Sequence, residues 1–162
     1  MLRPVRTFYL ISRVSAAVNA QLERVLKPLD VTVAQYTCMS RIRGHEVMSS
    51  AKLARTHRVS PQAMYEMITN LEKRGLLMRK KGPDDKRQFL VSLTRKGHHL
   101  LQACDLRVDA IEPAVFAGVN TANHALLREL LQIVIENARP EEQREAANDP
   151  EPPSNVRAGT NE

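Results

Sequence analysis

The sequence predicts a mainly α-helical fold that carries a small wing of two or three β-strands. Three observations lead to this prediction. Apolar residues recur every three or four positions along most of the first 138 residues, which is the period of a helix. Between Gly75 and Thr94 the period changes to two, which indicates a β-hairpin. Hydroxyl residues and prolines stand where helices would begin, and glycines stand where helices would end.

The first two expected helices precede the hairpin by some distance. A long helix should run from Val5 to about Leu26, and Lys27-Pro28 should end it, because proline disfavours helix in the residue before it. A second helix should begin after its cap, Thr32, and run to Arg43, where Gly44 stops it. The apolar stripe of the first helix comprises Phe8, Ile11, Val14, Val18, Leu22 and Val25.

Two shorter helices and the hairpin come next. A helix over 49–57 is capped by Ser49 or Ser50, and another begins at Ser60-Pro61, a hydroxyl cap followed by proline at the first helical position. Residues 77–80 and 89–93 read as strands, joined by the turn-forming, basic segment KKGPDDKR. The order of helix, helix, helix and two strands is typical of a winged helix-turn-helix, in which the helix from Ser60 is the recognition helix.

The last two helices complete the expected domain organisation. Thr94 should cap a helix over 94–112 that Pro113 interrupts, and a final helix should span about 121–138. Helices at both ends lack an obvious partner within the chain, which favours a homodimer, although packing on the chain's own core is the alternative. We therefore expect dimerisation helices at 1–30 and 98–139, a winged helix-turn-helix at 31–97 and a disordered acidic tail at 140–162.

The charge distribution points to a polyanionic partner. The chain carries +6 overall, but the tail from Pro140 holds six acids against two arginines. The segment 73–96 holds nine basic and two acidic residues, a density typical of nucleic-acid-binding surfaces, although a merely solvated basic face is the alternative. No run approaches the roughly 18 apolar residues of a membrane helix. With two distant cysteines, no metal-ligand spacing and no catalytic motif, we expect a cytoplasmic protein that is not an enzyme and binds no cofactor or metal.

The stretch SPQAMYEMITNLEKRGLLMRKKGPDDKRQFLVSLTRKG resembles the multiple-antibiotic-resistance-regulator (MarR) family. The similar motifs run from Leu71 to Leu76, over Asp85-Lys86-Arg87, and from Leu93 to Gly97. Upstream, LDVT at 29–32 followed by Gln35-Tyr36 is similar to the opening of the family's second helix. The resemblance covers roughly residues 5–138, and it implies a dimeric winged-helix regulator that binds a palindromic operator in double-stranded DNA.

The resemblance and the residue chemistry together predict a set of DNA contacts. The recognition helix would present base-reading side chains to the major groove, and the wing would reach the adjacent minor groove, where the family's arginine, here Arg87, enters beside Asp85. Glu66 departs from the family pattern, since many members carry arginine there; it would pair with Lys73 or Arg74, or lie back toward Arg58. The predicted contacts are Ser60, Pro61, Gln62, Ala63, Glu66 and Thr69 on the recognition helix, Lys52, Arg55, Arg58 and Arg74 as phosphate anchors, and Lys80, Lys81, Asp85, Lys86 and Arg87 on the wing.

The resemblance also implies an effector. Family members often bind small phenolic or aromatic carboxylates between the dimerisation helices and the winged domain, so we expect a repressor that such a ligand releases. The matching positions are Phe8, Tyr9, Ser12, Arg13, Tyr36 and His45. Two alternatives stay open: a redox-sensing regulator that uses Cys38 or Cys104, and a winged helix that binds protein or RNA.

Overall fold

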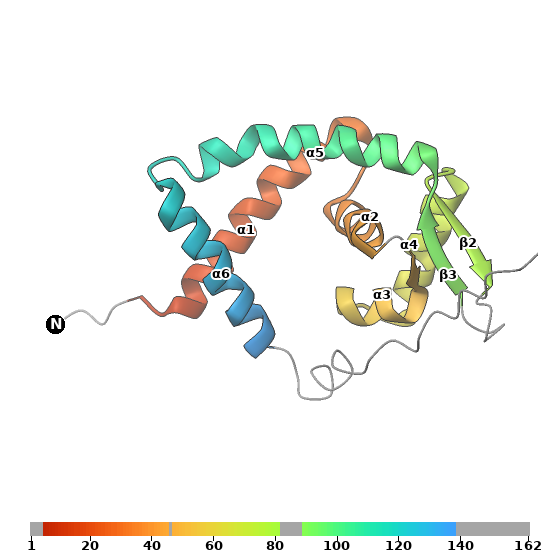
Figure 1. Ribbon diagram of the computed structural model, residues 1–162, viewed down its shortest axis with the longest axis horizontal. Coiled ribbons are helices and arrows are strands. Elements are labelled where there is room, and N and C mark those ends of the chain that lie inside the picture. The colour runs from red at the N-terminus through yellow and green to blue at the C-terminus, as the bar shows by residue number, and fades with distance from the viewer. Residues whose placement is uncertain (1–4, 46, 82–88, 139–162) are drawn as a thin grey trace, which may run out of the picture. The chain divides into compact units, whose positions relative to one another are not determined.

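The computed structural model describes residues 5–45, 47–81 and 89–138, and its fold is mainly α-helical with one three-stranded sheet. The chain divides into two compact units, Met1–Val115 and Phe116–Glu162. The first unit contains α1 to α5 and the sheet, and the second contains α6 (Figure 1). The predicted fold class, a helical protein with a small β wing, is confirmed. The wing residues Asp85, Lys86 and Arg87 and the predicted tail lie outside the described residues.

Helix α1 spans Thr7–Leu26 and continues into a short 3-10 turn, η1, at Lys27–Leu29. Asp30 then adopts the left-handed conformation (φ 52°), which turns the chain toward α2 at Val33–His45. Thr32 and Gln35 form a capping box: the Gln35 amide donates to the Thr32 hydroxyl at 3.2 Å, and the Thr32 amide donates to the Gln35 side chain at 3.1 Å. The predicted stop at Gly44 was wrong, because Gly44 does not adopt a positive φ and α2 ends at His45, two residues after the predicted last residue Arg43.

The helix-turn-helix consists of α3 at Ser50–His57 and α4 at Pro61–Lys73. The sheet has the antiparallel order β1-β3-β2, with β1 at Met48–Ser49, β2 at Leu77–Lys81 and β3 at Phe89–Leu93. In the hairpin, Leu77 pairs with Leu93 and Lys81 with Phe89. Strand β1 was absent from the predicted elements, since two residues are too short to show a period of two.

Helix α5 spans Arg95–Val115, and α6 spans Thr121–Asn137. The prediction that Pro113 interrupts α5 was wrong, because the helix continues through the proline for two more residues. Proline removes one backbone donor and its ring crowds the carbonyl four residues before it, so only two further residues follow Pro113 in the helix. The side chain of Asn120 caps α6 by accepting from the Asn123 amide at 2.8 Å.

One hydrophobic core joins the helix-turn-helix, the sheet and α5 in the first unit. Its fully buried members include Met39 and Ile42 of α2, Leu71 of α4 and Leu101 of α5. Helix α1 contributes only its C-terminal part, where Leu26 is fully buried. The core therefore fixes α3, α4 and the hairpin against α2 and α5.

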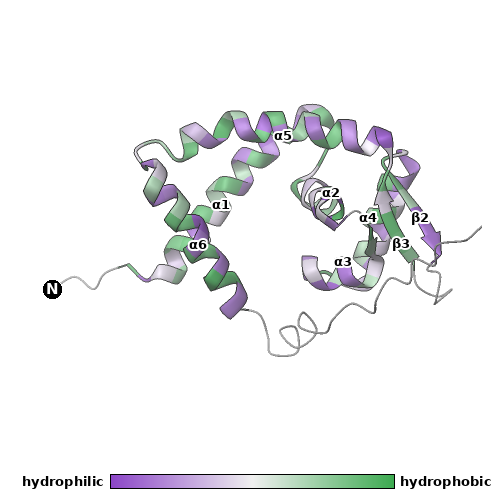
Figure 2. Ribbon diagram, viewed as in Figure 1, coloured by the Kyte–Doolittle hydropathy of each residue, from purple (hydrophilic) through white to green (hydrophobic). Residues whose placement is uncertain are grey.

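Exposed apolar side chains are concentrated on α1 and α6, and Figure 2 shows hydrophobic residues along the ribbons of both helices. In the N-terminal half of α1, Phe8 is 83% exposed and Val14 is 60% exposed. Helix α6 has no buried residue. Its exposed apolar side chains are Leu126, Leu130, Leu131, Ile133, Val134 and Ile135. Both faces are of a kind that usually marks an interaction site.

Candidate nucleic-acid interface

Two hydroxyl caps and one left-handed residue set the geometry of α3 and α4. Ser49 caps α3 by accepting from the Lys52 amide at 3.2 Å, and Ser60 caps α4 by accepting from the Ala63 amide at 3.1 Å. Between the helices, Arg58 adopts φ 53°, and its amide bonds back to the last turn of α3. Pro61, the first residue of α4, has no N–H group, but an N–H at this position would have no partner within the helix. This local chemistry is what the sequence predicted for the recognition helix.

Helix α4 has three faces with different surroundings. Met64, Ile68 and Leu71 are buried in the core. The opposite face carries Gln62, Ala63 and Glu66, which are all exposed together with Ser60 and Pro61. Five of the six DNA contacts predicted on the recognition helix are therefore exposed outside the protein core. The sixth, Thr69, lies on the third face, which turns toward the hairpin.

Glu66 pairs with a residue that the sequence interpretation did not consider. The amide nitrogen of the Gln62 side chain donates to Glu66 Oε1 at 2.8 Å, one helical turn away. The pair is exposed, so both side chains keep acceptor atoms toward solvent. Acceptors on a recognition helix match amino groups of cytosine or adenine in the major groove.

The predicted phosphate anchors and wing lysines differ in their exposure. Arg55, Arg58, Lys80 and Lys81 are exposed, and Lys52 is half-buried. These cations come from α3, from the turn after it and from β2, the elements that contact α4. Exposed cations on elements beside a recognition helix suit a polyanion.

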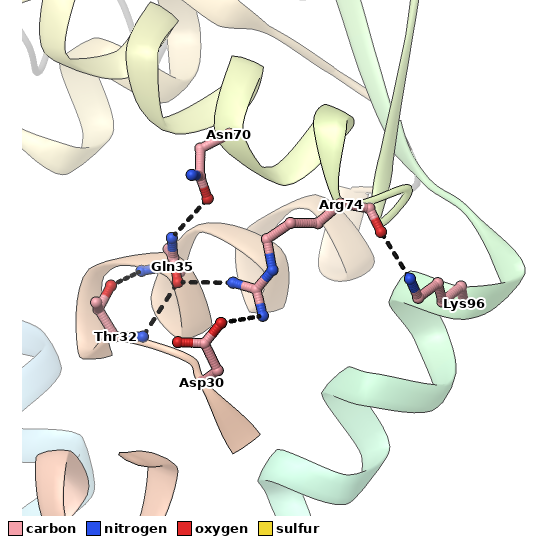
Figure 3. Close-up of polar contacts among 6 residues, drawn as sticks. All are labelled: Asp30, Thr32, Gln35, Asn70, Arg74 and Lys96. Atoms are coloured by element: carbon pink, nitrogen blue, oxygen red, sulfur yellow. Dashed lines mark hydrogen bonds and ion pairs between the residues drawn. The ribbon is translucent and has the colours of Figure 1, made fainter. Parts of the chain in front are cut away.

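Arg74, predicted as a phosphate anchor, takes part in a polar cluster within the protein (Figure 3). Its Nη2 lies 3.4 Å from Asp30 Oδ2, and its Nη1 donates to Gln35 Oε1 at 3.5 Å. The Lys96 ammonium donates to the Arg74 carbonyl at 2.8 Å, which ties the end of α4 to the start of α5. Gln35 also donates to Asn70 Oδ1 at 3.2 Å. The cluster thus joins α4 to α2 and α5, and a DNA contact by Arg74 stays a prediction.

The residue that sequence reasoning missed is Arg79 on β2. Its guanidinium donates to Glu72 Oε2 through Nε at 2.9 Å and through Nη2 at 2.5 Å, and Nη2 also donates to Thr69 Oγ1 at 2.9 Å. A signal was present in the sequence, because Arg79 alternates with Leu77 on the inward face of a strand. A charge at such a position requires a partner.

A groove of about 470 Å³ lies beside these residues, between α3, α4 and the hairpin. Ala54, Val59 and Ile68 give it apolar walls, and Arg55 and Arg79 line it as cations. The sequence analysis did not predict this groove, since its walls come from three elements that only the fold brings together.

The residues predicted to bind an effector fall into two groups in the first unit. Phe8, Tyr9, Ser12 and Arg13 are exposed on α1, where the Arg13 guanidinium lies 5.9 Å from the centre of the Tyr9 ring. His45 is also exposed, at the end of α2. Tyr36 instead donates to Asp105 Oδ1 of α5 at 3.0 Å, and Asp105 also forms an ion pair with Arg43. Burial, then the bond to Asp105 and its charge, raise the pKa of Tyr36 to about 12.

The two cysteines are both buried in the core. Burial raises the pKa of the Cys38 thiol to about 11, and burial followed by the charge of Asp105 raises that of Cys104. A reactive cysteine is favoured by a low pKa and access to solvent, and the buried thiols of Cys38 and Cys104 have neither in this structure; the redox alternative stays a prediction. In the described part of the chain, no three histidine, cysteine or acidic side chains gather as a metal site, and no helix is long and apolar enough to span a membrane.

Comparisons with known proteins agree with this geometry. The model of the MarR family matches residues 31–89, which is the segment from α2 to the start of β3. A regulator of the helix-turn-helix type from Bacillus subtilis, YhbI, is 31% identical over 109 residues, which cover 67% of this chain and 71% of that protein. The chain belongs to the MarR family. Members are transcriptional regulators, so the chain is a DNA-binding transcriptional regulator.

Other relatives of the family cover more of the chain. A helix-turn-helix transcriptional repressor of Mycobacterium tuberculosis is 28% identical over 124 residues, or 76% of this chain and 89% of the repressor. Among solved structures, a mutant of MarR from Escherichia coli complexed with operator DNA has a TM-score of 0.70 at 28% identity, and the match covers 78% of this chain and 91% of that one. The wild-type apo form has a TM-score of 0.73 at 27% identity, covering 82% of this chain and 98% of that one.

Proposed function

We propose that this MarR-family protein is a homodimeric repressor that recognises a palindromic operator and is released by a small aromatic or phenolic ligand. The exposed face of α4, together with the exposed cations of α3, of the turn after it and of β2, carries the proposal. Gln62, Ala63 and Glu66 offer base-reading chemistry there, and Arg55 and Arg58 offer phosphate contacts. The operator complex of MarR from Escherichia coli and the repressor of Mycobacterium tuberculosis support the same role.

The order of elements around the hairpin supports the use of the wing. Lys80 and Lys81 end β2 directly before the segment that holds Asp85, Lys86 and Arg87. An arginine at a wing tip suits the narrow, electronegative minor groove of A·T-rich DNA. The proposal keeps the four regions predicted from the sequence. They are the terminal dimerisation helices at 1–30 and 98–139, the winged helix at 31–97 and the tail at 140–162.

In vitro selection from a random duplex library tests the DNA proposal. The full chain should enrich a palindrome with half-sites about one helical turn apart. The logarithm of its affinity should fall linearly with the logarithm of the salt concentration. Arg87→Ala should weaken binding to the enriched duplex and lower the salt slope by about 1. Enrichment of no duplex sequence, or preferential binding to single-stranded RNA, would contradict the proposal.

The exposed apolar faces of α1 and α6 support the homodimer. Monomeric proteins rarely leave such faces in water, and a stable interface buries on the order of 1,000 Å² or more. Light scattering on the full chain should give twice the mass of one chain. Replacing both Phe8 and Val14 with aspartate should shift the protein toward the monomer. Asn19→Asp adds a charge to the same helix at an exposed polar position and serves as the control.

The effector proposal rests on Arg13 and Tyr9. An exposed guanidinium beside an aromatic ring suits a carboxylate carried on a second ring. Aromatic acids such as salicylate, added at increasing concentration, should release the wild-type protein from the enriched duplex. Arg13→Met should raise the concentration needed and leave the affinity for DNA unchanged. Identical release of wild type and Arg13→Met would exclude Arg13 as the ligand contact.

A further inference from the structure

Arg79 occupies a position in β2 where the strand pattern calls for an apolar side chain. Leu77 is buried, and alternation along the strand places Arg79 on the same side of the sheet, facing α4. Its side chain is only 15% exposed. A cation in such a place is tolerated only when its donors are satisfied. The contacts of Arg79 therefore reveal what this position does.

Those contacts reach three residues on one face of α4. Glu72 accepts two hydrogen bonds and Thr69 accepts one, while the ring of Tyr65 lies 5.0 Å from the guanidinium carbon. Spacings of four and three residues place Tyr65, Thr69 and Glu72 in a row along the helix. From the sheet, the Phe89 ring lies 5.9 Å away. The hydrogen bonds and charge of Glu72 raise the pKa of Arg79 above its ordinary value.

We propose that Arg79 is a positioning residue that holds the wing strands against the recognition helix, so that both meet DNA at one fixed angle. This inference rests on the proposed function, because it explains how α4 and the wing act together. Arg79 stands two residues before the end of β2, and its bonds form a polar link from that strand to α4. Without the link, the wing would have to be ordered when DNA binds, which costs affinity.

A direct contact between Arg79 and DNA is the competing explanation, and a substitution at Glu72 distinguishes it from the positioning role. Glu72→Gln removes the ion pair and one negative charge near the predicted interface. If Arg79 positions the wing, this change weakens binding to the duplex enriched by the wild type. If Arg79 contacts phosphate itself, the change frees its guanidinium and strengthens binding. The sign of the effect therefore decides between them.

The binding experiment uses two variants and one control. Arg79→Met keeps the length of the side chain without its donors, and it should weaken binding about tenfold. Glu72→Gln should weaken binding about threefold. Glu23→Gln removes a negative charge from an exposed position on α1 and should bind as the wild type does. Tighter binding by Glu72→Gln, or wild-type binding by both variants, would overturn the inference.

Hydrogen exchange tests the inference without DNA. In Glu72→Gln, the amides of the outer hairpin, where Lys81 pairs with Phe89, should exchange several times faster, while the amides of α2 keep their wild-type rates. Unchanged exchange in the hairpin would refute the positioning role even if the variant folds normally. If the wild type itself selects no DNA sequence, the proposed function fails, and the exchange rates still decide whether Arg79 holds the hairpin.

Discussion

The Gly97→Ala substitution tests how α5 begins against the end of the hairpin. A Cβ atom at Gly97 would lie 2.1 Å from the Leu76 carbonyl oxygen and 3.0 Å from a methyl carbon of Leu93. Ordinary contacts of this kind are 3.4–4 Å, so the backbone of α5 would have to move by more than about 1 Å. A backbone carbonyl cannot swing aside as a flexible side chain can.

The hydrogen bonds around this contact set the size of the effect. The Leu76 carbonyl accepts from the Thr94 amide at 3.0 Å and from the Thr94 hydroxyl at 3.2 Å, and that hydroxyl caps α5 by accepting from the Gly97 amide at 3.0 Å. Overpacking costs about 1–3 kcal/mol, and each weakened bond adds about 1 kcal/mol. We expect Gly97→Ala to lower the free energy of unfolding by roughly 4–6 kcal/mol.

Urea unfolding of the full chain, followed by circular dichroism at 222 nm, measures this change. Wild type and variants are compared at one protein concentration, because association would otherwise shift the midpoint. Gly44→Ala is the matched control: it is helical and has no atom within 4 Å of its added Cβ, so it should be neutral or stabilising by up to about 1 kcal/mol. A Gly97→Ala protein within about 0.5 kcal/mol of wild type would refute the packing of α5 on Leu76.

Three further predictions concern titratable groups. Since the pKa of Cys38 is about 11, only about 0.1% of its thiol is ionised at pH 8, and a thiol reagent should react with it only after urea unfolds the protein; fast labelling of the native chain would show otherwise. Asp105→Asn should lower the pKa of Tyr36 from about 12 toward 10, though not fully because burial is the larger cause, and absorbance at 295 nm during alkaline titration measures it. Burial and then the nearby charge of Arg41 lower the pKa of His57. As the pH is lowered below about 6.5, the unfolded chain therefore binds a proton that the folded chain does not, and the free energy of unfolding decreases. His57→Gln should make this decrease smaller when urea unfolding is measured across that pH range.

Local chemistry explains why so much of the fold could be predicted. Ser60 caps α4 and Pro61 begins it through interactions within a few residues, and these operate whatever surrounds them. The helix ends were predicted less well than the helix starts. Gly44 and Pro113 weaken a helix locally, yet α2 runs one residue and α5 two residues past them. The residues beyond both signals are exposed, so burial in the core does not account for this difference of one or two residues, which is usual at helix ends.

In the candidate site, the exposure of residues could be predicted from the sequence, but their bonding partners could not. The exposure of Gln62, Ala63 and Glu66 follows from the period of the helix, which the apolar stripe of α4 reveals. The partners of Thr69 and Arg74 do not follow from any period, because they lie 10 and 39 or more residues away along the chain. Sequence patterns report the environment of a residue and not the identity of a distant neighbour.

By itself, the sequence determined the order of the helices and the hairpin, the start of the capped helices and the face of α4 that meets solvent, since short-range hydrogen bonds and hydrophobic periodicity encode all of these. Its motifs also indicated the family. Only the tertiary structure decided which cationic side chains form hydrogen bonds or ion pairs within the protein. Arg79 binds α4 and Arg74 binds the Asp30 turn, while Arg55 and Arg58 stay exposed. The physical reason is that a guanidinium pairs with whatever acceptor folding brings within about 3 Å, and only the packed fold sets that distance.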